Sequence, residues 1–114
     1  MIPIVGGVFE GPRLRGTILR GGADWQLSRP DGVLELEARY VLRVDDGTHI
    51  AIRNAGVMTA ADDGGAPYVR TVASFDAPRE SSHAWLSRAI FVGTVALDRG
   101  PGAINVRVRI FQVL

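Results

Sequence analysis

The residues best suited to chemistry in this chain are Asp24 and His83. Asp24 lies in the segment GGADWQ, directly before Trp25, and a carboxylate beside an indole is a candidate general base. His83 is one of only two histidines and is the second candidate for proton transfer. An Asx turn after the two glycines is an equally good explanation for an aspartate at position 24. Because neighbours in a strand point to opposite faces, Asp24 and Trp25 should not face one cavity unless a bulge intervenes.

Nucleophilic and metal-dependent chemistry have weaker support. The chain has no cysteine and no Gly-x-Ser-x-Gly segment. His49 and His83 are too far apart to form a local ligand motif, and the Asp-Asp pairs at 45–46 and 62–63 precede glycine, where turns favour them. We therefore expect no metal and no cofactor. All 13 basic residues are arginine, so lysine Schiff-base chemistry is excluded while anion binding stays open.

Length and charge limit the classes of function. With 114 residues the chain is predicted to be a single domain, residues 1–114. Basic and acidic residues nearly cancel, 13 against 12, and form no basic stripe, so we expect no nucleic-acid partner. The chain has no run of about 18 apolar residues and no charged-then-apolar leader, which predicts a cytoplasmic protein that does not contact a membrane.

Residues 33–44 show the clearest strand pattern. Even positions are largely apolar and odd positions mostly charged over twelve residues, a length natural in a barrel. The Asp-Asp-Gly turn at 45–47 and the strand at 49–54 complete a hairpin. The charged face, with Glu37 and Arg39, is either a solvated exterior or a polar lumen, and the pattern leaves both open.

The rest of the chain also predicts strands and turns. A helical period is absent, and the short strands alternate with Gly, Pro and Asp turns, which is typical of a barrel or sandwich. Residues 55–67 are predicted to form a loop, and 98–102 a tight turn. Further strands are expected at 1–9 (bent at Gly6 and Gly7), 14–19, 68–75, 84–97 (with a helical turn at 85–87) and 104–114.

Several motifs together resemble a known family. The segments GGADWQ, RPDG, ARY, IRNAG, YVRT and AWLSRAIFVGT, in this order between residues 4 and 113, resemble the bacterial and fungal domain-of-unknown-function family 3237. The resemblance implies an all-β fold, a small antiparallel β-barrel similar to lipocalin-like and allene-oxide-cyclase-like barrels, and a homo-oligomer. It implies no settled activity.

Family positions that look like pocket residues fall here on Asp24 and on six candidate ligand-binding residues, namely Trp25, Arg39, Asn54, Arg70, Trp85 and Arg88. The chain departs from the family in three places. It begins one strand later, it has Ser87 where the family usually has asparagine, and its loop at 57–67 is short. A barrel that lacks a strand exposes an edge, so we expect a homodimer or higher homo-oligomer in which a second subunit covers that edge.

Three functions remain open. The first is metal-free acid–base chemistry of the isomerase, cyclase or lyase type, with Asp24 and His83 as catalytic residues. The second is binding, without turnover, of a small, partly apolar molecule, aromatic or carbonyl-bearing, in the barrel pocket. The third is a structural oligomer without a pocket.

Overall fold

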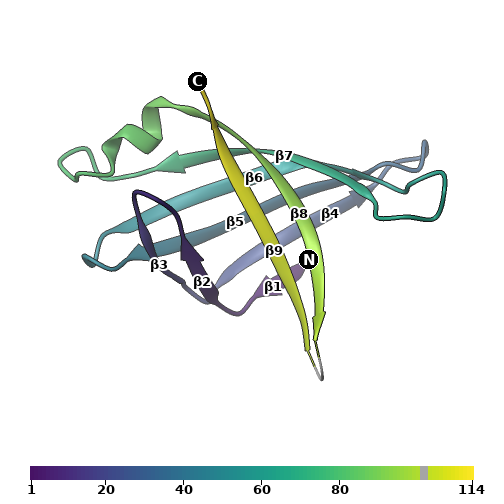
Figure 1. Ribbon diagram of the computed structural model, residues 1–114, viewed down its shortest axis with the longest axis horizontal. Helices are drawn as coiled ribbons and strands as arrows, with labels where there is room; N and C mark the ends of the chain where they lie inside the picture. The colour runs from purple at the N-terminus through teal and green to yellow at the C-terminus, as the bar shows by residue number, and fades with distance from the viewer. Residues whose placement is uncertain (101–102) are drawn as a thin grey trace.

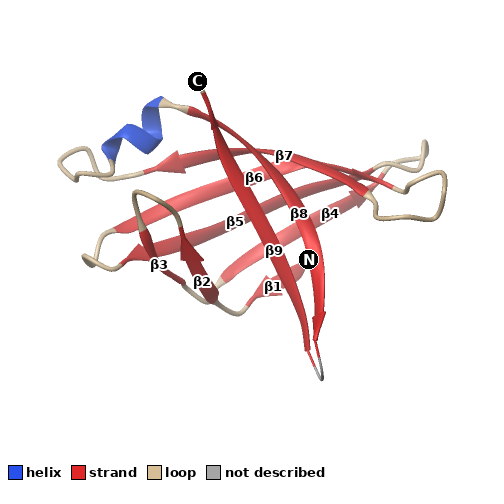
Figure 2. Cartoon of the chain, viewed as in Figure 1, coloured by secondary structure: helices blue, strands red, loops and turns tan. Residues whose placement is uncertain are grey.

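In the part of the chain that the structure describes, one curled antiparallel sheet forms a half-barrel, with one short 3-10 helix at one end (Figures 1 and 2). The computed structural model describes residues 1–100 and 103–114, and side chains other than those of 98–104. The strands are β1 (Ile2–Ile4), β2 (Gly7–Glu10), β3 (Arg15–Ile18), β4 (Gly22–Ser28), β5 (Leu34–Val44), β6 (His49–Thr59), β7 (Tyr68–Asp76), β8 (Ile90–Gly100) and β9 (Ala103–Val113), and the helix is η1 (Ala84–Arg88). The all-β, barrel-like fold predicted from the sequence is confirmed. No helix among the described residues is long and apolar enough to cross a membrane.

The β5–β6 hairpin has the turn that its sequence predicts. Gly47 adopts a positive φ of 90°, which glycine tolerates without strain, and its N–H donates to the Val44 carbonyl at 2.8 Å. The Asp46 carboxylate accepts from the N–H of Thr48 at 2.9 Å. This compact turn sets the register of β5 against β6, from Arg43 opposite His49 to Leu34 opposite Met58.

The structure corrects several predicted boundaries. The strand predicted at 84–97 begins only at Ile90, because η1 occupies Ala84–Arg88 and so extends the helical turn predicted at 85–87. The segment after residue 54 was predicted as a loop, but β6 continues to Thr59 and pairs with β7 up to Tyr68. Its weak pattern comes from Ala55 and Gly56, and a side chain at Gly56 would collide with the Arg70 carbonyl, so close strand pairing itself requires glycine. The predicted turn at 98–102 shrinks, because β8 runs to Gly100; its remaining residues, 101–102, lie outside the described residues.

The strand order leaves the sheet open. The order is β1-β4-β5-β6-β7-β8-β9, with the β2–β3 hairpin attached to β5, so β1 and β9 are the end strands of the described path. Along β9, Val106 and Val108 on one face and Phe111 and Val113 on the other are exposed. An edge strand with apolar side chains on both faces is a favourable site for pairing with another chain.

The hydrophobic core lies on one face of the sheet, which we call the inner face. Its buried residues are Leu42, Val44, Ile50, Ile52, Ala73, Ala77, Leu86 and Phe91. Ile50 is completely buried, and Phe75 meets Phe91 edge-on with ring centroids 4.9 Å apart. The β2–β3 hairpin and η1 pack on the core near the β5–β6 turn, where burial of each large side chain stabilises the fold by about 1.5–3 kcal/mol.

Candidate functional site

Strand register divides the predicted site residues between the two faces of the sheet. Residues paired across strands share a face, and each next residue along a strand points to the other face. One row on the inner face consists of Ile2, Asp24, Ala38, Asn54, Ala73, Phe91 and Gln112. The adjacent row, on the face that we call the outer face, consists of Trp25, Glu37, Ala55, Val72, Val92 and Phe111. Asp24 and Trp25 therefore point to opposite faces.

Three buried oxygens on the inner face have no hydrogen-bond partner among the described residues. They are Oδ1 of Asp24, Oδ1 of Asn54 and Oγ1 of Thr71, which we call the inner-face polar cluster. Asn54 is 5% exposed and Thr71 4% exposed. A buried polar atom without a partner costs about 1–3 kcal/mol, so each of these oxygens favours a bound hydrogen-bond donor.

The three side chains come from β4, β6 and β7, which the sheet brings close together. Asn54 and Thr71 belong to adjacent strands and lie diagonally, since Asn54 pairs with Ala73 and Thr71 pairs with Gly56. Asp24 lies two strands from Asn54, about 10 Å between backbones. Its second oxygen, Oδ2, accepts from the Nε2 amide of Gln26 at 3.3 Å, which leaves Oδ1 as the unpaired atom.

The sheet between these oxygens carries very small side chains. Ala38 separates Asp24 from Asn54, and glycines 56 and 93 flank Thr71 in the register. A Cβ atom on Gly93 would lie only 2.6 Å from the Thr71 hydroxyl oxygen. These small residues form a floor of backbone and methyl groups next to the polar cluster, and Ala73 and Gly93 within it are buried. We define this floor as Ala38, Gly56, Ala73 and Gly93.

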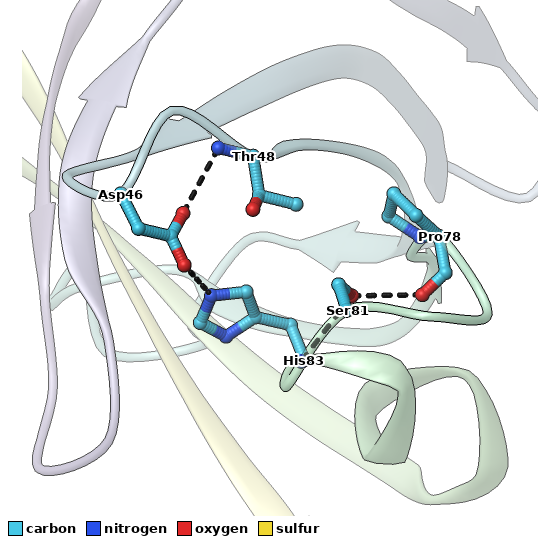
Figure 3. A network of polar contacts seen from close by, with 5 residues as sticks. All are labelled: Asp46, Thr48, Pro78, Ser81 and His83. Carbon is cyan, nitrogen blue, oxygen red and sulfur yellow. Dashed lines mark hydrogen bonds and ion pairs between the residues drawn. The ribbon is translucent and has the colours of Figure 1, made fainter.

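His83 lies far from Asp24, so the structure does not bring the two predicted catalytic residues together. Its Nε2 is 2.8 Å from Oδ2 of Asp46, whose other oxygen is held by the Thr48 N–H (Figure 3). Asp46 lies in the turn after β5, whereas Ala38, the pairing partner of Asp24, lies six residues before the end of β5, on the order of 20 Å along the strand. His83 is buried directly before η1, so its contact with Asp46 holds the start of the helix against the β5–β6 turn.

The Asp46 carboxylate is strongly stabilised in its ionised form. The backbone N–H of Thr48, then its side chain, and then His83 lower the pKa of Asp46 from 3.8 to about 2. On the other side of His83, its backbone N–H donates to the Ser81 hydroxyl, which itself donates to the Pro78 carbonyl at 2.7 Å (Figure 3). These contacts belong to the fold, and they explain why a buried histidine is tolerated at this position.

The predicted ligand-binding residues do not gather in one place. Asn54 belongs to the polar cluster, whereas Trp25, Arg39 and Arg70 lie on the outer face. Arg70 donates from Nη1 to the Val69 carbonyl at 2.7 Å and lies over the ring of Tyr68.

The two predicted residues of η1 lie outside the polar cluster as well. Trp85 packs at the edge of the core, 6.0 Å from Phe91, with the Arg13 guanidinium 3.7 Å above its ring. Arg88 is exposed in the last turn of η1.

Thr71 was missed in the sequence, although a signal for it exists. In residues 68–75 it occupies the same alternation phase as Val69, Ala73 and Phe75, so it is a polar residue on an apolar face. Asn54 follows Ile50 and Ile52 in the same manner. A polar residue in phase with core residues is a sharper indicator of a site than a charged residue on a solvated face.

The described residues contain no group of three or more His, Cys, Asp or Glu placed to hold a metal ion. Several acidic residues take part in turns and ion pairs, as at Asp31, which pairs with Arg29 at 2.6 Å.

Comparisons with known proteins agree with the predicted resemblance. An uncharacterised UPF0311 protein of Clostridium acetobutylicum is 38% identical over 104 residues, 81% of this chain and 65% of the relative. The hydroalkoxylation enzyme phnH of Penicillium herquei is 28% identical over 91 residues, 80% of this chain and 53% of the relative. The chain thus spans roughly half to two thirds of the length of these two relatives.

Solved structures match the fold over nearly the whole chain. A β-barrel-like protein of Acinetobacter baumannii superposes with a TM-score of 0.81 at 29% identity, covering 97% of this chain and 75% of that one. A conserved protein of unknown function from Rhodopseudomonas palustris gives 0.84 at 31% identity, covering 98% and 80%. The model of the family described as "Protein of unknown function (DUF3237)" matches residues 1–113, and the chain belongs to this family.

Proposed function

We propose that the inner face binds a small, partly apolar molecule that carries hydroxyl or N–H donors. The observation that carries this proposal is the set of three buried, unpartnered oxygens of Asp24, Asn54 and Thr71. A carboxyl oxygen, an amide oxygen and a hydroxyl oxygen can all accept hydrogen bonds, so a ligand that donates is complementary to them. Filling these positions recovers the desolvation cost that the folded chain otherwise bears.

The surroundings of the cluster favour a flat ligand body. The floor of Ala38, Gly56, Ala73 and Gly93 carries no side chain larger than a methyl group, so a flat aromatic or conjugated ring needs the least displacement of neighbouring side chains to lie against it. Phe91 borders the floor as a large apolar neighbour in the register. Gln26 is exposed beside Asp24, so the cluster has a solvent-facing side through which a ligand can enter.

A second candidate is acid–base catalysis by Asp24 in the same place, and the similarity to a hydroalkoxylation enzyme supports it. In an intramolecular hydroalkoxylation, a hydroxyl O–H bond and the π bond of an alkene break, while a C–O bond and a C–H bond form at the two alkene carbons. A carboxylate that takes the hydroxyl proton and returns it to carbon balances this reaction. Asp24 has the free oxygen for this step. His83 has no part in it.

Binding is tested with a matched pair of probes, 2-naphthol and 2-methoxynaphthalene, which differ by the hydroxyl proton. Backbone amide NMR titrations should show 2-naphthol binding roughly tenfold more tightly or better, since a hydrogen bond to a charged or buried acceptor is worth about 1.5–3 kcal/mol. Shifts should map to Asn54 and Thr71, and Thr71→Val should weaken 2-naphthol alone. Equal affinities, or shifts on the outer face, would refute the proposal.

Catalysis is tested separately with 2-allylphenol, whose ring closure to a dihydrobenzofuran is an intramolecular hydroalkoxylation. If Asp24 is the acid–base group, the wild-type chain forms the product and Asp24→Asn binds the probe without converting it. If the wild-type protein binds 2-allylphenol but forms no product, Asp24 does not catalyse the reaction of this probe and only the binding function is supported. Asp63→Asn, in the loop before β7, is the control for a change of charge alone.

A further inference from the structure

The outer face carries a groove that the inner-face proposal does not use. Its volume is about 550 Å³, within the range of small-molecule sites. Three arginines, Arg20, Arg39 and Arg53, line it together with Ser74, and among the described lining residues only Asp76 is acidic. The groove lies across β5, β6 and β7, on the opposite side of the sheet from Asn54.

Two of these arginines are held side by side by one carboxylate. Arg39 and Arg53 are paired in the register, and Oε1 of Glu37 accepts from Nε of Arg39 at 2.8 Å and from Nε of Arg53 at 2.9 Å. The single negative charge of the Glu37 carboxylate is therefore shared between two positively charged guanidinium groups. The ends of both guanidiniums keep their N–H groups in the fork geometry that matches an oxyanion.

A second hollow, lined by both apolar and charged side chains, adjoins this arginine pair on the same face. It has a volume of about 270 Å³, shares Arg53 with the groove, and contains Trp25, Leu27 and Ala55. Trp25 is 47% exposed and Leu27 63% exposed, although both are large apolar side chains. An indole open to solvent beside a fixed cation is an arrangement suited to a ligand with an apolar body and a charged head.

We propose that the outer face binds a small amphiphilic monoanion, with its carboxylate on Arg39 and Arg53 and its apolar body against Trp25 and Leu27. A single negative charge is specified because Glu35 and Glu37 line the second hollow and would repel a second negative charge on the ligand. The ion pairs are partly exposed, so affinity falls as salt rises. This site is separate from the inner-face polar cluster and takes a different class of ligand.

The test compares decanoate below its micelle concentration with decanol, which has the same chain without charge, and with inorganic phosphate, which has charge without the chain. Amide and indole NMR shifts should show saturable decanoate binding at Trp25, Arg39 and Arg53. Decanol and phosphate should each bind at least roughly tenfold more weakly than decanoate, because decanol lacks the negative charge and phosphate lacks the apolar chain.

The variants Arg39→Gln and Arg53→Gln should each weaken decanoate several-fold and leave decanol unchanged, whereas Trp25→Ala should weaken both. Arg43→Gln is the matched control, since Arg43 lies on the same face of β5 outside the groove. Equal binding of decanoate and decanol, decanoate shifts confined to Asn54 and Thr71, or no saturable shift at all would each overturn the proposal. The NMR spectrum of each variant also reports whether it is folded.

Discussion

Thr71→Val should stabilise the free protein while it impairs the inner-face site. Oγ1 of Thr71 is buried without a partner, and valine has nearly the same shape with a methyl group in place of the hydroxyl. Gly93, which lies opposite, has no side chain to collide with that methyl group. Removal of an unsatisfied hydroxyl recovers about 1–3 kcal/mol, and we expect a net gain of about 1–2 kcal/mol in the free energy of unfolding.

Urea denaturation followed by tryptophan fluorescence measures this change. A gain of about 1–2 kcal/mol corresponds to a rise in Tm of roughly 4–8 °C for a domain of this size. Thr94→Val is the control, because Thr94 is on the outer face of β8 and only half buried, and should stay within about 0.5 kcal/mol of the wild type. A loss of about 1 kcal/mol or more in Thr71→Val would mean that the hydroxyl is already bonded, and would remove the basis of the inner-face site.

Three further predictions concern other parts of the chain. The pKa of Asp46 falls to about 2 in the folded chain, chiefly through hydrogen bonds from Thr48 and then from His83, so its contribution to stability is present above pH 4 and is lost as pH approaches 2. Asp46→Asn should flatten this loss in urea midpoints measured against pH, and an unchanged profile would contradict the hydrogen bonds of this carboxylate to Thr48 and His83. Gly93→Ala should abolish binding of 2-naphthol, because the added methyl group collides with the Thr71 hydroxyl. NMR titration measures this affinity, and an unchanged value would show that the ligand binds elsewhere. We propose that a second copy of the chain pairs with the edge of β9. Native mass spectrometry should therefore show a dimer, and Phe111→Lys should convert this dimer to monomers. A wild-type protein that is monomeric at high concentration would contradict the proposal.

Much of the local structure could be predicted from residue pattern. Alternation over residues 33–44 predicted β5 to within one residue, and the Asp-Asp-Gly turn predicted its hairpin. The separation of Asp24 from Trp25 onto opposite faces also followed from alternation alone. The extension of β6 beyond residue 54 could not be predicted from the pattern, because Ala55 and Gly56 have little intrinsic strand preference. Their pairing with β5 and β7 holds them in the extended conformation.

The candidate site was predictable only in part, for a physical reason. Side-chain alternation is a property of the local backbone, so the sequence by itself determined which residues share a face within each strand. Which strands become neighbours is decided by the burial of whole faces across the chain, and only the tertiary structure shows it. That pairing placed Thr71 beside Asn54 and near Asp24, and left His83 at the far end of the sheet, fastened to Asp46.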